Sequence, residues 1–242
     1  VIIPAMALVA GVMSESNVNT ILIPRTGLRD GVLFDLHEQH SASKDSTSLQ
    51  RNLNNVRSYA IQLGRRYSFD EQHAIHAVKL ALQIFDQTRS LHNLGGEERA
   101  LLEIATLLHD IGHFINSSEH NEHSEYIIRS SHFVGLSEVE RELVALTTRY
   151  HRGALPSNRD RNFSQLSKLQ KKTVMVLSGI IRLVEELDRE HLRRVSKIAI
   201  RKRGRDLVIK LPAPSRLLVE RMGAESRKGA LEESLGVAIH LV

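Results

Sequence analysis

The spacing of apolar positions along the chain predicts a mainly helical protein. From residue 49 to residue 191, apolar side chains recur every three or four positions, which is the period of an amphipathic helix. Ser68 and Ser137 are each followed three residues later by a glutamate, the pattern of a helix-capping box. We therefore expect helices that cover residues 49–64, 68–89, 97–108, 137–152 and 167–191.

The two ends of the chain show other patterns. Behind Pro4 the apolar residues predict a short buried helix, and beyond His191 short apolar runs predict strands. At the N-terminal end we expect a helix, a strand, a turn and a helix at residues 4–13, 20–24, 27 and 28–35. At the C-terminal end we expect strands at residues 195–200, 206–210 and 237–242, a basic connection at 201–205, and helices at 216–222 and 230–235.

These elements divide the chain into four parts. We expect a small α/β segment at residues 1–36, a serine-rich linker at 37–48, a helical domain at 49–191 and a small α+β unit at 192–242. The apolar start is too short for a membrane-spanning helix, which needs about 20 residues, and it lacks the basic residues of a signal peptide. Because it has no initiator methionine, we expect the sequence to be part of a longer protein.

Composition narrows the chemistry that this chain supports. Hydrophobic residues make up 41% and charged residues 25% of the 242 residues, as in an ordinary globular protein. Thirteen histidines and no cysteine mean that a metal site would use His, Asp and Glu; missing cysteine also fits a cytoplasmic protein. The net charge of +5 favours an anionic partner. Basic residues 193–205 form either a solvated edge or a polyanion-binding strip, and without interleaved aromatics we expect no sequence-specific nucleic-acid binding.

Three predicted helices each carry a ligand-type residue at a position that is otherwise apolar. His73 lies four residues before Ala77, and His109 lies four residues after Ala105. Asp188 continues the apolar positions of the last long helix at the same spacing. One histidine on an apolar face is commonly a satisfied core residue, but the coincidence of three such positions favours a metal site built between packed helices.

The adjacent pair His109 and Asp110 would supply two ligands of this site. Together with His73 and a carboxylate of the last helix, they suit a divalent ion such as Zn, Fe, Mn or Mg. Such an ion can generate hydroxide near neutral pH and offset phosphoryl charge, which favours hydrolysis of phosphate esters or anhydrides. We prefer Asp188 as the last ligand because it continues the apolar face, with Glu185, one turn earlier, as the alternative.

The remaining histidines leave several roles open. His113, His120 and His123 follow the His-Asp pair closely and could bind a second ion, contact phosphate or be solvated. His151 and Arg152, at a predicted helix end, could bind an anionic substrate or complement the helix dipole. We take His120, His123, His151 and Arg152 as candidate phosphate-binding residues.

These residues resemble a known family. His73, the segment Leu-Leu-His109-Asp110-Ile-Gly-His and Asp188 are similar to the HD-domain metal phosphohydrolase pattern. More narrowly, four segments resemble the C-terminal half of exopolyphosphatase/guanosine pentaphosphate phosphatases, the Ppx/GppA family: residues 109–115, 120–124, 150–157 and 187–189. The segment Gly-Leu-Arg-Asp-Gly-Val at residues 27–32 is similar to the one that closes that family's actin-like phosphatase domain.

The resemblance implies an HD-type all-helical domain, preceded by a short α/β remnant of an actin-like domain and followed by a small α+β unit. It also implies hydrolysis of terminal phosphoanhydrides of inorganic polyphosphate or guanosine pentaphosphate, with a divalent ion, in a homodimer. The family's main site, with its glycine-rich phosphate loops and acidic base, would lie upstream of Val1, so we expect the isolated chain to lack a complete exopolyphosphatase site.

Two alternatives stay open beside this expectation. The helical region could be a self-sufficient HD phosphohydrolase acting on a nucleotide, or a non-catalytic module for polyphosphate binding and dimerisation. We take Asp110 and His113 as the candidate catalytic residues. His113 stands where many HD proteins carry a lysine, and Glu185 aligns with the aspartate that closes the general HD pattern.

Overall fold

The computed structural model describes most of the chain as two compact units, Val1–Ser46 and Thr47–Val242. The described residues are 2–16, 18, 20, 48–133, 135–204, 206–212 and 216–242. The first unit contains helix α1 (Ile2–Glu15), so the predicted N-terminal helix is confirmed. Val9 and Val12 of this helix are 46% and 57% exposed, and the described part of this unit shows no second element packed on them, so its burial stays a prediction. Residues 21–35 of the predicted strand, turn and helix, the motif at 27–32 and linker residues 37–47 lie outside the described residues.

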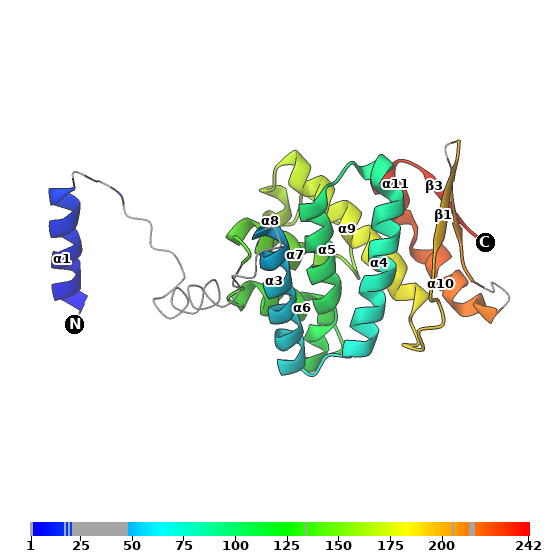
Figure 1. Ribbon diagram of the computed structural model, residues 1–242, viewed down its shortest axis with the longest axis horizontal. Helices are drawn as coiled ribbons and strands as arrows, with labels where there is room; N and C mark the ends of the chain where they lie inside the picture. The colour runs from blue at the N-terminus through cyan, green and yellow to red at the C-terminus, as the bar shows by residue number, and fades with distance from the viewer. Residues whose placement is uncertain are drawn as a thin grey trace. The chain divides into compact units, whose positions relative to one another are not determined.

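The second unit is mainly helical, as predicted, and ends in a small sheet (Figure 1). Its helices are α3 (Ser48–Arg66), α4 (Glu71–His92), α5 (Gly96–Leu108), the 3₁₀ helix η1 (Ile111–Phe114), α6 (His120–Ser130), α7 (Glu138–Arg149), α8 (Arg161–Ser164), α9 (Lys168–Leu187), α10 (Leu218–Arg227) and α11 (Gly229–Leu235). Apolar spacing gave no prediction for η1, α6 or α8. None of the helices in the described part of the chain combines the length and apolar character that crossing a bilayer requires.

Helix α9 lies at the centre of this unit. Ser167 accepts the backbone N–H of Gln170 and starts the helix with a capping box. The helix packs against α4, α7, α10 and α11, and in Figure 1 it lies behind α4 and α5. Gly179 permits the close approach of α11, because a Cβ there would lie 3.1 Å from Cα of Leu231. The C-terminal end of α9 therefore sits among helices on several sides.

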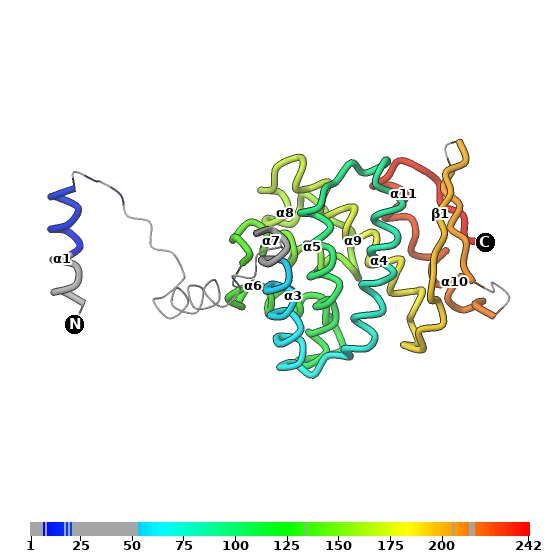
Figure 2. Tube along the Cα trace, viewed as in Figure 1, coloured from blue at the N-terminus to red at the C-terminus, as the bar shows by residue number. Residues whose placement is uncertain are grey.

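The three strands form one small sheet near the C-terminus (Figure 2). Strands β1 (Ala199–Arg203) and β2 (Asp206–Lys210) are antiparallel, whereas β2 and β3 (Ala238–Leu241) are parallel. The boundaries predicted for the first strand were wrong, because the basic residues 201–203 pair with β2 and residues 195–198 lie outside the strand.

Helix α4 holds the start of strand β1 in place. Gln83 accepts the N–H of Ile198 at 2.9 Å, and Gln87 donates to the carbonyl of Ile198 at 3.0 Å and accepts the N–H of Ile200 at 2.8 Å. In the described sheet β1 is an edge strand, so its outer backbone groups have no strand partner. The amides of Gln83 and Gln87 hydrogen-bond these groups and thereby attach the sheet to helix α4.

Several helix ends differ from those predicted. Ser137 caps α7 as expected, but α4 is capped by Asp70, whose carboxylate accepts the N–H of His73 at 3.0 Å. Ser68 instead has a left-handed backbone with φ of 50°, so it cannot act as the cap. Helix α7 ends at Arg149 and not at residue 152, and α9 ends at Leu187 and not at residue 191. Both early ends place candidate site residues, His151 and Asp188, on turns.

Candidate metal centre

Four ligand-type side chains converge from three helices. His73 is in the first turn of α4, His109 and Asp110 follow the last residue of α5, and Glu185 is in the last turn of α9. The side chains of His73 and His109 are only 1% exposed, whereas those of Asp110 and Glu185 are 17% and 22% exposed. The site is thus buried on the imidazole side and open on the carboxylate side.

The distances between these groups are those of a compact cluster. Nε2 of His109 lies 2.8 Å from Oε2 of Glu185 and 3.5 Å from Oδ2 of Asp110. Nε2 of His73 lies 3.4 Å from Nε2 of His109 and 3.5 Å from the same oxygen of Glu185. Two imidazole nitrogens and two carboxylates therefore point toward one small region, as the sequence predicted for His73, His109 and Asp110.

Both imidazole rings are oriented by bonds on their other nitrogen. Nδ1 of His73 lies 2.9 Å from Oδ2 of Asp188, and Nδ1 of His109 lies 2.7 Å from the carbonyl of Thr106. Because these oxygens only accept, each Nδ1 carries the proton, and in the neutral ring the Nε2 lone pair faces Glu185. Metal-binding histidines in proteins are held in this way.

The carboxylates of the cluster stabilise positive charge on the neighbouring imidazoles. Burial by itself would lower the pKa of His73, but the hydrogen bonds to Asp188 and Glu185 raise it to about 10. Burial likewise opposes ionisation of Asp110, yet His109 and His120 hold the pKa of this carboxyl well below its usual range. A divalent cation would meet the same electrostatic demand and compete with the proton on His73.

Glu185 and Asp188 occupy different sides of His73. Asp188 bonds the Nδ1 side and also accepts the backbone N–H of Arg193 at 2.5 Å, whereas Glu185 faces Nε2. Ligand atoms of His73, Asp110, Glu185 and His191 all lie within 4.8 Å of one another, a group that includes neither His109 nor Asp188, although Nε2 of His109 lies 2.8 Å from Oε2 of Glu185. The geometry therefore favours the alternative ligand, Glu185, and gives Asp188 the role of orienting His73.

His191 was not among the predicted site residues. Its ring stacks on that of His73 with centroids 3.7 Å apart and planes 5° from parallel, and its Nδ1 lies 3.0 Å from Oδ2 of Asp70. It reaches this place because the chain leaves α9 at Asp188 and turns through a left-handed residue with φ of 55° at position 191. The feature of the sequence that could have indicated His191 is its position three residues beyond Asp188.

A second group of ligand-type atoms adjoins the first. Asp110, His120 and His151 offer atoms within 4.8 Å of one another, and both histidines are 2% exposed. Burial, together with the charge of His109, lowers the pKa of His151 to about 3. His113 on η1 stacks on His120 with ring centroids 3.9 Å apart, and its side chain is 43% exposed at the edge of the cluster.

Two predicted phosphate-binding residues lie apart from these groups. Arg152 is exposed and lines a separate hollow of about 560 Å³ with Arg149 and Arg159. His123 is half-buried on α6, and within the described residues no hydrogen bond or ion pair joins it to the cluster. Phosphate binding by either residue stays a prediction.

The second group is held by residues that sequence reasoning did not single out. The buried guanidinium of Arg182 on α9 donates to the carbonyls of Tyr150, Gly153 and Ala154 at 2.7 to 2.8 Å, and so fixes the turn that carries His151. A charged residue inside the apolar stretch of α9 was the signal that could have indicated it.

Gly112 and Ser124 hold His120 at the start of α6. The hydroxyl of Ser124 donates to the carbonyl of His109 and accepts the N–H of Gly112, at 2.7 and 2.8 Å. A Cβ on Gly112 would lie 2.0 Å from the carbonyl oxygen of His120, so only glycine permits this approach. The start of α6 is thus fixed directly against the His-Asp turn.

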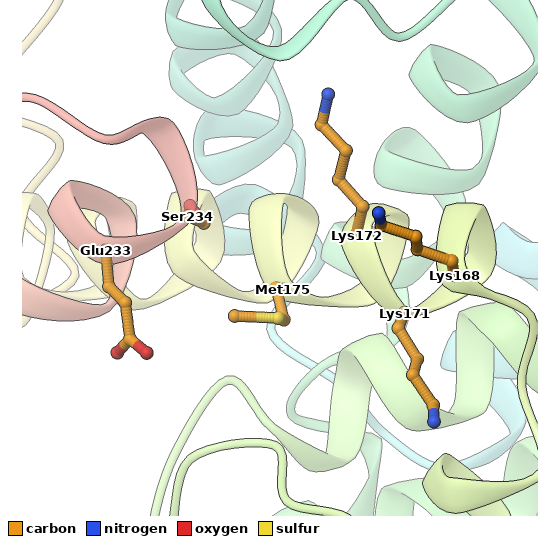
Figure 3. A pocket seen from close by; sticks show the side chains of 6 residues that line it. All are labelled: Lys168, Lys171, Lys172, Met175, Glu233 and Ser234. Carbon is orange, nitrogen blue, oxygen red and sulfur yellow. The ribbon is translucent and has the colours of Figure 1, made fainter.

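A lysine-rich hollow of about 410 Å³ lies elsewhere on α9. It is lined by Lys168, Lys171, Lys172 and Met175 of α9 and by Glu233 and Ser234 of α11. Figure 3 shows the side chains of Lys171 and Lys172 pointing to opposite sides of the helix. The hollow begins at the opposite end of α9 from Glu185, roughly 25 Å along the helix axis. It is therefore separate from the metal centre, and its cations do not converge on one point.

The family model described as Ppx/GppA phosphatase, domain III, matches residues 56–222, which is well over half of the chain. The match spans both histidine groups.

Proposed function

The chain belongs to the Ppx/GppA phosphatase family, and on that premise we propose that it is the C-terminal part of a phosphatase that hydrolyses terminal phosphoanhydrides of inorganic polyphosphate or guanosine pentaphosphate. Its own contribution is a divalent metal centre at His73, His109, Asp110 and Glu185. One observation carries this proposal: two buried Nε2 atoms, with their Nδ1 atoms already bonded, face the carboxylate of Glu185.

The donor set fits a divalent ion. Two imidazole nitrogens and two carboxylates, without thiolate, suit Zn, Fe, Mn or Mg, and the ring of His191 is available as a further donor. When bound, such an ion polarises a phosphoryl group and offsets its negative charge. Asp188 and the carbonyl of Thr106 keep the two rings in the tautomer that the ion needs.

The exposed side of the centre is where an anionic substrate would arrive. Asp110 and Glu185 are partly exposed, and His113 stands beside Asp110 with its Nε2 3.7 Å from Oδ1. His113, partly exposed beside Asp110, is therefore the group placed to exchange a proton with a substrate oxygen. The same opening supports a second candidate function, in which this centre by itself hydrolyses a nucleotide phosphoanhydride.

An assay of the 242-residue chain with and without the upstream domains separates these functions. Phosphate release from polyphosphate and guanosine pentaphosphate is measured after metal removal and after addition of Mn(II). Metal binding with turnover only in the longer protein supports the first function. Metal-dependent turnover by the isolated chain that Asp110→Asn abolishes supports the second. A chain that binds polyphosphate but no metal contradicts both and leaves a non-catalytic binding module.

A further inference from the structure

An exposed aromatic side chain lies next to the opening of the metal centre. Phe114 is the last residue of η1, the 3₁₀ helix that starts directly after Asp110. Phe114 is 59% exposed, and the next residue, Ile115, is 51% exposed. Every other phenylalanine in the described part of the chain is buried or half-buried. Single exposed apolar residues are common on proteins, but these two adjoin a site whose other groups are charged or polar.

The ring of Phe114 is held in place by Tyr67. The two rings meet edge to face, with centroids 5.4 Å apart and planes at 85°. Tyr67 is half-buried against the hydrophobic core, and its N–H donates to the carbonyls of Leu63 and Gly64 in the last turn of α3. This aromatic pair, Phe114 and Tyr67, therefore has a fixed position, while much of the surface of Phe114 stays open to solvent.

The aromatic pair joins the two segments that border the metal centre. On one side Phe114 follows His113, whose side chain is 43% exposed at the edge of the histidine cluster. On the other side Tyr67 lies three residues before Asp70, whose carboxylate lies 3.0 Å from Nδ1 of His191. A flat group bound on the aromatic pair would thus lie beside the opening and leave the metal ligands free.

The separation of the aromatic pair from the metal centre suits the length of a nucleotide. From Asp110 to Phe114 the 3₁₀ helix advances about 8 Å, at roughly 2 Å per residue. A ribose and its phosphates span such a distance, so a base can stack on Phe114 while the terminal phosphates reach the metal centre. Inorganic polyphosphate is anionic along its whole length and gains no affinity from an apolar surface.

We propose that the aromatic pair binds the base of a nucleoside phosphate, and that this class of substrate, rather than inorganic polyphosphate, occupies the metal centre. The inference rests on the proposed function, because it takes the metal centre as the place of the phosphates. Every base has a flat face that can stack on an aromatic ring. Phe114 therefore distinguishes a nucleotide from bare phosphate and does not select one base.

Two matched probes test this inference: the β,γ-imido analogue of GTP, and inorganic imidodiphosphate, which has the same terminal phosphates without the nucleoside. Both resist hydrolysis, so isothermal titration of the Zn(II)-loaded chain measures binding alone. Phe114→Ala is expected to weaken binding of the GTP analogue by about 10-fold or more and to leave imidodiphosphate binding unchanged. Phe114→Tyr keeps a flat ring and should retain the affinity. The control is Tyr126→Ala, which removes an exposed aromatic residue of α6.

Nuclear magnetic resonance of the unsubstituted chain gives a readout that does not depend on the folding of a variant. A base stacked on Phe114 shows an upfield ring-current shift and nuclear Overhauser contacts to the phenyl protons. Equal affinity for the two probes, or an unchanged affinity of Phe114→Ala for the GTP analogue, overturns the inference and leaves the proposed metal centre standing. A chain that takes up no Zn(II) overturns that centre and, with it, this inference.

Discussion

Nδ1 of His73 lies 2.9 Å from Oδ2 of Asp188, on the opposite edge of the ring from the nitrogen that faces Glu185. One carboxylate thus fixes the tautomer of the imidazole, and the other stands where a metal ion would bind. The two acidic residues are one helical turn apart at the end of α9, yet they have different roles.

Asp188→Asn is expected to weaken metal binding by about 10- to 100-fold. The amide can donate an N–H to Nδ1 of His73, which favours the tautomer that carries its proton on Nε2. In that tautomer Nε2 has no lone pair to offer a metal ion. Isothermal titration of the metal-free chain with Zn(II) measures this loss. Unchanged affinity would show that Asp188 does not set the state of this ring.

Glu185→Gln is expected to weaken metal binding more than Asp188→Asn does. It removes a charged ligand that faces both His73 and His109, whereas Asp188 acts through His73 alone. The same titration compares the two variants, with Glu190→Gln, an exposed glutamate just beyond α9, as the control. The opposite order of losses would restore Asp188 as the ligand.

Gly112→Ala is expected to lower the free energy of unfolding by about 3 kcal/mol. Its Cβ would collide with backbone atoms of His120 and Ser124, at 2.0 and 2.6 Å, so α6 must move away. Urea unfolding measures the change. Gly96→Ala is the control, since a Cβ there meets nothing within 4 Å, and its effect should stay within about 0.5 kcal/mol. Similar values for both variants would contradict the close approach of α6.

Arg182→Met is expected to destabilise the chain by about 3 kcal/mol, because three carbonyls lose their donor. It should also loosen the turn of His151. Chemical unfolding measures the loss of stability, and hydrogen exchange of the backbone amides of residues 150–154 measures the loosening. A variant with unchanged stability and unchanged exchange would show that Arg182 does not hold this turn.

Addition of metal is expected to stabilise the folded chain. At a free Mn(II) concentration 100 times the Kd, one bound ion contributes about 2.7 kcal/mol. Thermal unfolding with and without Mn(II) measures this as a rise in Tm, which the double variant His73→Ala, His109→Ala should abolish. An equal rise in that variant would place the binding elsewhere on the chain.

The sequence indicated part of this site. Ligand-type residues at apolar helix positions led to His73, His109 and Asp188, because a buried polar side chain on a regular helix is visible in the residue spacing. Residue spacing led us to prefer Asp188 over Glu185, but the two lie within one turn at the end of α9, and only the ring orientation of His73 separates them.

Other members of the site depend on irregular backbone. His191 reaches His73 through a left-handed residue, which no periodic pattern predicts. Helix α6 lacks a clear apolar face in the sequence, so the burial of His120 depends on how α6 packs against η1 and α7, which residue spacing does not predict. The first sheet strand was misplaced for a similar reason, because its pairing with β2, and not its apolar content, sets its position.

Anomalous X-ray scattering at the manganese edge, from crystals of the chain grown with Mn(II), tests the metal centre most directly. The account predicts a strong anomalous peak within bonding distance of Nε2 of His73 and His109 and of a carboxylate oxygen of Glu185. The absence of such a peak in crystals that hold Mn(II) at other positions would contradict it.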